Sequence, residues 1–130
     1  MAFLIHSVDD GHVLPWEYLP AEDLIPQVGM ALKMESGNLV VASGADRPQY
    51  VAMCTMEDFV PAGGRIPVVR VTSDVVWESF LTASGNSLNV GDSVNISGDG
   101  MGVNNTVGGS AQIVEMLARS TGSTVRVRFQ

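Results

Sequence analysis

Short apolar segments separated by glycine and other turn-forming residues run from Gly29 to the end of this chain, and they constrain its fold more than any other feature. In residues 124–129 (TVRVRF) apolar and polar side chains alternate strictly, which predicts a strand with one buried face. Many short strands with frequent turns, among fourteen glycines, predict an all-β fold, a small barrel or sandwich of antiparallel strands. Strands are expected at residues 30–34, 39–42, 50–55, 66–72, 75–82, 93–97, 111–117 and 124–129.

Three segments allow more than one local structure. Residues 112–119 contain helix formers but also Ile113 and Val114, whose β-branching favours a strand. The glycine-rich residues 98–109 (GDGMGVNNTVGG) are expected to form a long loop or a bulged hairpin. Residues 20–25 start with a proline and are compatible with a single helical turn.

The first 27 residues differ in composition from the rest of the chain. They contain five acidic residues, three prolines, several large apolar side chains and no lysine or arginine. The spaced prolines favour an extended, turn-broken backbone, while the apolar content is higher than in a disordered tail. We therefore expect an extended N-terminal arm over residues 1–27 and a β-rich body over residues 28–130. The arm packs either on its own body or on a neighbouring subunit.

The charge balance limits the classes of partner. Fourteen acidic residues against seven basic ones give a net charge of -7, so the basic face that nucleic acid requires is not expected. No apolar stretch approaches the length of a membrane span. Charged residues make up only 16% of the chain and apolar ones 45%. A surface with so little charge is typical of subunits that bury it against other proteins.

Residues able to carry chemistry are few. His6 and His12 are the only histidines and Cys54 the only cysteine, so a metal site would lack a third ligand on a rigid element. No constellation for nucleophilic or acid–base catalysis is visible. We expect no catalytic, metal or cofactor site and no enzymatic activity. The unpaired Cys54 and the start of the chain, which lacks a basic stretch, are typical of a protein made and kept in a reducing cytoplasm.

Five segments together resemble the head decoration (capsid cement) proteins of tailed bacteriophages. They are residues 29–32 (GMAL), 37–42 (GNLVVA), 48–53 (PQYVAM), 64–71 (GRIPVVRV) and 125–129 (VRVRF), and they span most of the body. The resemblance implies a viral structural protein, made in the bacterial cytoplasm and located on the capsid exterior. It implies that a homotrimer binds the major capsid protein and stabilises the head.

The resemblance also implies a role for the arm. Residues 2–8 would add a strand to the edge of a capsid sheet, a mode in which backbone hydrogen bonds provide affinity. Deleting residues 2–14 is then expected to weaken attachment and leave the body folded. The candidate capsid contacts are Phe3, Leu4, Ile5, Trp16 and Tyr18.

Other surface functions remain open beside capsid decoration. The chain is also compatible with another virion subunit, such as a head-fibre base, a tail tube or a baseplate protein. A carbohydrate-binding β module is a further alternative, and it would require aromatic side chains in a concave patch.

Overall fold

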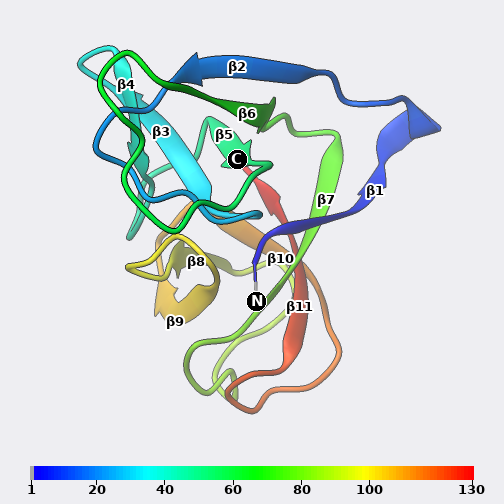
Figure 1. Cartoon of the computed structure of the whole chain (residues 1–130). Coiled ribbons are helices and arrows are strands. Elements are labelled where there is room, and N and C mark those ends of the chain that lie inside the picture. The colour runs from blue at the N-terminus through cyan, green and yellow to red at the C-terminus, as the bar shows by residue number, and fades with distance from the viewer. Residues whose placement is uncertain (1) are drawn as a thin grey trace.

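The computed structural model describes residues 2–130 and consists of two antiparallel β-sheets packed against each other (Figure 1). The all-β prediction is confirmed, as a sandwich and not as a closed barrel. A short 3-10 turn, η1 (Asp9–Gly11), follows the first strand. The strands are β1 (Leu4–Val8), β2 (Trp16–Pro20), β3 (Ala31–Glu35), β4 (Asn38–Val41), β5 (Tyr50–Ala52), β6 (Arg65–Arg70), β7 (Val75–Phe80), β8 (Ser93–Ile96), β9 (Val103–Val107), β10 (Ala111–Met116) and β11 (Thr124–Phe129).

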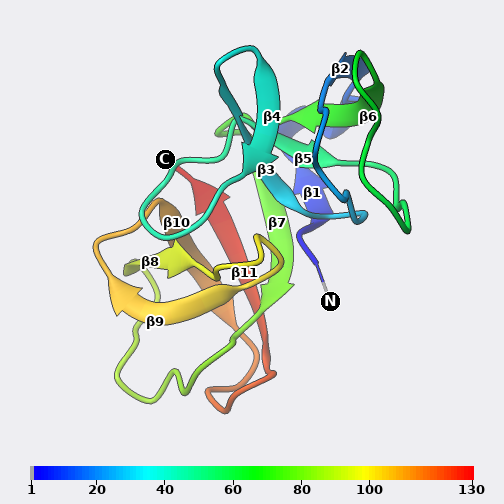
Figure 2. The same cartoon turned by 60° about the vertical axis from the view of Figure 1, so that its left-hand side comes forward.

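The strand order places the start of the chain at the edge of both sheets. The six-stranded sheet has the order β1-β7-β11-β10-β8-β9, and the five-stranded sheet has the order β2-β6-β5-β3-β4. Figure 2 shows the two sheets as separate layers. The chain passes between them twice, from β1 to β2 and from β6 to β7. β1 is therefore an edge strand of the six-stranded sheet, and β2 is an edge strand of the five-stranded sheet.

Residues 2–27 are extended and lie along the body of their own chain. β1 pairs with β7, with Leu4 opposite Glu78, and β2 pairs with β6, with Trp16 opposite Val69. The register of β1 shifts between Ile5 and Ser7, a bulge of the kind common at sheet edges. Of the two packing modes that the sequence left open, this structure has the arm on its own body.

Two hydrophobic cores explain why the five-stranded sheet is apolar on both faces. The larger core fills the space between the sheets and contains Val69, while the smaller core contains Val68 and lies on the outer face of the five-stranded sheet. Residues 21–30 and 53–64 cover this outer face. A strand buried on both faces has a nearly continuous apolar sequence, as in residues 66–69 (IPVV) of β6.

The ambiguous segments are decided by tertiary contacts. Residues 111–116 form β10 because Ile113 is buried in the larger core and its backbone pairs with Val127 of β11. The glycine-rich residues 98–109 include β9, which forms the bulged hairpin with β8. Residues 20–25 contain a turn at Glu22 and Asp23 and no helix. The expected strands are present with their ends shifted by a few residues, as is usual for strand boundaries.

Candidate interaction surface

Exposed apolar side chains concentrate near the start of the chain. Eleven large apolar side chains are exposed in residues 2–130, and seven of them belong to residues 4–28. Single exposed apolar residues are common, but a concentration of them indicates a contact surface. The seven are Leu4, Ile5, Val13, Trp16, Tyr18, Ile25 and Val28.

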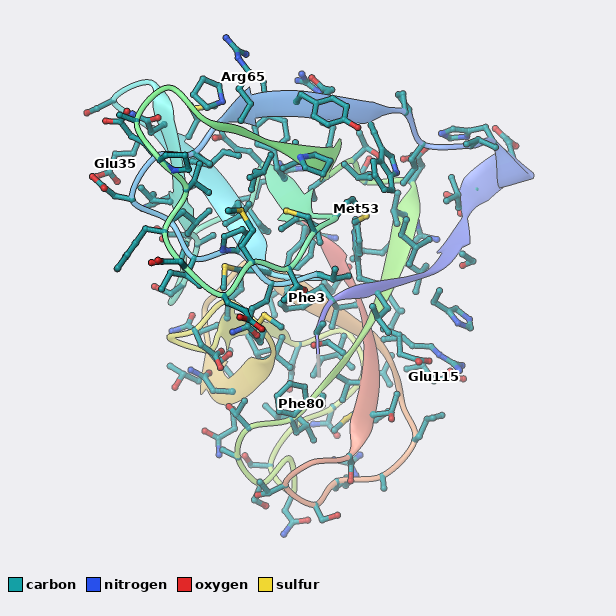
Figure 3. The ribbon with its side chains drawn as sticks, in the orientation of Figure 1. Phe3, Glu35, Met53, Arg65, Phe80 and Glu115 are labelled. Atoms are coloured by element: carbon teal, nitrogen blue, oxygen red, sulfur yellow. The ribbon has the colours of Figure 1, made fainter. Side chains whose placement is uncertain are left out.

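The first strand divides its apolar side chains between the core and the surface. Phe3 is fully buried, and its ring meets the ring of Phe129 edge to face with centroids 5.2 Å apart. Figure 3 shows Phe3 in the interior of the sandwich. Leu4 and Ile5 are exposed on the edge strand β1. Of the expected contact residues, Phe3 is thus occupied in the core, because burying an aromatic ring stabilises the fold more than leaving it in water.

Trp16 and Tyr18 are the prominent exposed aromatic residues of β2. They are two residues apart on one strand, so they project from the same face of the sheet. Their exposed fractions are 56% and 60%, although both rings are attached to a strand held along its length by β6. Rigid aromatic side chains of this kind lose little entropy on binding and often dominate interface energies.

The outer backbone edge of β2 is partly blocked. The C=O of Pro67 on β6 points away from β2 and accepts a hydrogen bond from the N–H of Met53, just after β5, at 3.0 Å. Tyr18 is paired with Pro67 across the two strands. In an antiparallel pair of this kind the backbone N–H and C=O of Tyr18 point away from β6, toward the open edge. There the Arg65 guanidinium donates to the Tyr18 C=O at 3.3 Å, and Pro20 has no N–H to offer. This edge is protected from continuous strand addition, which leaves side chains as its main means of contact.

A groove of about 400 Å³ lies between the loop that precedes β2 and the connection from β6 to β7. Its polar residues come from the two connections between the sheets and from the adjoining strands β2 and β6. The groove is lined by His12, Leu14, Pro15, Glu17, Arg70, Thr72, Ser73 and Asp74.

One wall of the groove is an ion pair between neighbouring strands. The Arg70 guanidinium donates to the two carboxylate oxygens of Glu17 at 2.9 and 3.1 Å. This hydrogen bonding lowers the pKa of Glu17 and raises the pKa of Arg70. Arg70 also lies over the ring of Tyr50, with its Cζ atom 5.4 Å from the ring centroid. The charges of Glu17 and Arg70 are therefore paired with each other within the protein.

The opposite wall contains His12 beside Ser73 and Asp74, residue types that would be required for nucleophilic catalysis. Nε2 of His12 lies 3.3 Å from a carboxylate oxygen of Asp74, and Nδ1 lies 3.2 Å from the C=O of Asp9. Because both partners are acceptors, neither ring nitrogen is placed to remove a proton from Ser73. The Thr72 hydroxyl donates to Asp74 and lowers the pKa of that carboxyl. The arrangement ties two loops together.

The two histidines contact different carboxylates. Nδ1 of His6 is 4.0 Å from Glu78 on β7, whereas His12 lies beside Asp74. Among residues 2–130, no group of three or more His, Cys, Asp or Glu side chains is placed to hold a metal ion. Burial raises the pKa of the Cys54 thiol, which reduces its reactivity.

Four of the five residues proposed from the sequence as contacts are exposed, and other exposed apolar residues were not foreseen. Leu4, Ile5, Trp16 and Tyr18 are exposed as a contact would require, yet Val13 is the most exposed of the apolar group, at 89%. A single valine in a loop carries no local signal of exposure. The groove was missed as well, because its walls come from segments more than fifty residues apart in the sequence.

A search for membrane-spanning helices and comparisons with known proteins complete the description of the chain. In residues 2–130, no helix has the length and apolar character required to cross a membrane. Comparisons with protein-family models and with curated proteins found no match for this chain.

Proposed function

We propose that this protein is a structural subunit of a tailed-bacteriophage head, a decoration protein that binds the outer face of the capsid and stabilises it. The observation that carries the proposal is the concentration of exposed apolar side chains on β1, β2 and the loop between them. The resemblance of the body to decoration proteins and the β-sandwich fold support it.

Contact through this surface would rely on anchoring side chains on a rigid support. Trp16 and Tyr18 would occupy apolar depressions of the major capsid protein, with Leu4 and Ile5 on β1, the edge strand of the other sheet, as further contacts. These side chains are already fixed on paired strands, so they lose little conformational entropy when they bind. The proposed assembly is a homotrimer, and several copies held on one lattice would bind more tightly than a single chain.

Rebinding to bare heads tests the proposal directly. Purified protein is mixed with undecorated capsids of the phage that encodes it, and occupancy is measured by co-sedimentation and cryo-electron microscopy. We expect ordered density on the capsid exterior. Replacing both Trp16→Ala and Tyr18→Ala should weaken attachment roughly several hundredfold, because buried aromatic anchors contribute about 2 kcal/mol or more each. Leu117→Ala, at an exposed apolar residue outside the surface, is the matched control.

Absence of binding by the folded wild-type protein would overturn the proposal. Native mass spectrometry distinguishes a decoration protein from the other virion subunits by its oligomeric state. A hexamer would favour a tail tube over a decoration trimer. A carbohydrate-binding role is less favoured because Trp16 and Tyr18 do not line the groove, which leaves that concavity without an exposed aromatic platform. Specific binding on a glycan array would reverse this preference.

A further inference from the structure

Two loops form a ribbon on the outer face of the five-stranded sheet, away from the groove. Residues 21–29 and 53–64 run antiparallel, and hydrogen bonds join them along their length. The Val60 N–H donates to the Leu24 C=O at 2.8 Å, and the Met56 N–H donates to the Pro26 C=O at 3.0 Å. At the far end, the Val28 N–H donates to the Thr55 hydroxyl at 3.0 Å. The ribbon is therefore a fixed surface, not a pair of independent loops.

The ribbon carries more apolar residues than the core requires. Ala21, Leu24 and Val60 point inward and are buried in the smaller core. A second set faces solvent, and its members lie in the same two loops. They are Ile25, Val28 and Phe59, with exposed fractions of 37%, 41% and 58%. Since the sheet is already covered by the inward set, the outward set adds nothing to the core.

The same ribbon holds uncompensated negative charge. Its acidic residues are Glu22, Asp23, Glu57 and Asp58, and residues 21–29 and 53–64 contain no lysine, arginine or histidine. In the part of the chain that the structure describes, none of these carboxylates is within ion-pair distance of a cation. By contrast Asp9, Glu17, Glu35, Asp46, Glu78 and Glu115 each lie within ion-pair distance of a lysine or arginine.

The nearest arginine in sequence does not neutralise this surface. Arg65 directly follows the second loop, but its guanidinium donates to the C=O of Tyr18 on β2. Figure 3 shows the Arg65 side chain projecting outward beyond the sheets. The two paired loops thus expose three large apolar side chains and four acidic residues that have no cationic partner within residues 2–130. We call this surface, formed by Ile25, Val28, Phe59 and the four carboxylates, the loop patch.

We propose that the loop patch binds a segment of another protein that combines lysine or arginine with apolar side chains. Charge complementarity selects this occupant, because a basic segment would pair with carboxylates that have no cationic partner within residues 2–130. Phe59 is the expected anchor, since an aromatic ring on a preorganised loop can be buried at little entropic cost. The proposal uses different residues from the capsid contact at β1 and β2 and does not depend on it.

A peptide titration followed by NMR tests the loop patch. The full-length, isotope-labelled protein is titrated with a synthetic peptide rich in lysine and leucine. Two further peptides serve as comparisons, one with glutamate in place of every lysine and one with serine in place of every leucine. We expect amide shifts confined to residues 22–28 and 55–60 with the first peptide, and affinity at least tenfold lower for the other two.

Variants at the loop patch assign the binding to its residues. Phe59→Ser should weaken binding of the lysine–leucine peptide about thirtyfold, as expected for an aromatic anchor. Glu57→Gln combined with Asp58→Asn should weaken it about fivefold, because each rim charge contributes roughly 0.5 kcal/mol. Leu117→Ser and Asp10→Asn are the matched controls, an exposed apolar residue and an exposed carboxylate outside the loop patch, and both should leave the affinity unchanged.

Several results would overturn the proposal. Equal binding of the serine-containing peptide would reduce the effect to general charge attraction, and equal binding of the glutamate-containing peptide would remove the role of charge. Amide shifts centred elsewhere would exclude the loop patch. Self-association of the wild-type protein that Phe59→Ser abolishes would identify a second copy of the chain as the occupant. Failure of capsid rebinding would leave these measurements unaffected.

Discussion

Phe3 and Gly29 together hold the start of the chain against the body. The Phe3 N–H donates to the Gly29 C=O at 2.9 Å, and Gly29 has a φ of +84°. A Cβ atom on Gly29 would lie 2.3 Å from the Cβ of Ala2 and 3.0 Å from the C=O oxygen of Phe3. Glycine is therefore required here both for the backbone angle and for the close approach.

Gly29→Ala should destabilise the fold more than an equivalent substitution without neighbours. Gly37 has a nearly identical φ of +85° and nothing within 4 Å of an added Cβ atom, so Gly37→Ala measures the backbone strain alone. We expect the steric clash to lower the free energy of unfolding by a further ~1–3 kcal/mol, as measured by urea unfolding. Equal destabilisation by the two substitutions would show that residues 2 and 3 move aside freely.

Asp74 is the residue whose titration reports on the junction of the two loops. The hydrogen bond from Thr72 is the main cause of its lowered pKa, and the positive charges of His12 and Arg128 contribute less. A carboxyl whose pKa is lower in the folded protein stabilises the fold above its unfolded pKa, and this contribution disappears as the pH falls through the folded value. Asp74 therefore contributes to stability at neutral pH, and this contribution is lost progressively as the pH falls below 3.8, its ordinary pKa, toward the lower folded value.

Thr72→Val removes that hydroxyl and should shift the Asp74 pKa upward, toward its ordinary value. The side-chain carboxyl carbon of Asp74, followed by NMR as the pH is lowered, measures the shift directly. The variant should also lose less stability on acidification than the wild type, because the difference between folded and unfolded pKa becomes smaller. An Asp74 titration that is unchanged in the variant would contradict this assignment.

At the scale of elements, polar contacts hold η1 against β11 and against the connection between β6 and β7. The Arg128 guanidinium on β11 donates to both carboxylate oxygens of Asp9 at 3.1 and 3.2 Å and to the Ser73 C=O at 2.8 Å. The Asp9 N–H also donates to the Asp74 C=O at 2.8 Å. The side chain of Arg128, which alternation alone would assign to solvent, thus joins β11 to η1 and to the connection between β6 and β7.

A double-mutant cycle measures this docking contact. Asp9→Asn, Arg128→Gln and their combination should give a coupling free energy of about 0.2–1 kcal/mol, the range for a partly exposed ion pair. The coupling should decrease toward zero in about 1 M salt, where exposed charges are screened. Additive effects at low salt would show that the two side chains do not interact in solution.

At the scale of the whole molecule, the buried Phe3 makes the N-terminal segment part of the fold. Deleting residues 2–14 removes Phe3 from the larger core and β1 from β7. Loss of one buried phenylalanine costs about 3–5 kcal/mol, a large share of the roughly 5–15 kcal/mol that stabilises a domain. The structure thus replaces the expectation of an intact body with that of a strongly destabilised or unfolded one.

Thermal unfolding of the truncated chain checks this prediction. Phe3→Ala alone should lower the melting temperature substantially, whereas Leu4→Ala, at an exposed neighbour, should change it little. If the truncated chain melted at the wild-type temperature, residues 2–14 would be an appendage, and their contribution would lie in binding alone.

Most strands of the body could be predicted from the sequence, whereas the exposure of individual side chains could be predicted only in part. The strands at residues 124–129 and 75–80 could be recognised because alternation and β-branching are local properties. β9 could be expected only as one of two alternatives, because glycine-rich residues 98–109 are compatible with a loop as well as with a bulged hairpin, and pairing with β8 decides between them. Likewise Leu4, Ile5, Trp16 and Tyr18 could be proposed as contacts from residue type, whereas the exposure of Val13 and Phe59 depends on which neighbours cover them.

The sequence by itself determined the all-β class, the position of most strands and the composition of the N-terminal segment, because backbone preference and side-chain alternation act over a few residues. Only the tertiary structure decided that this segment packs on its own chain, with Phe3 in the core and Trp16 and Tyr18 outside. It also decided which carboxylates lack a cation. Burial and charge pairing arise between segments far apart in the chain, so no local pattern of residues encodes them.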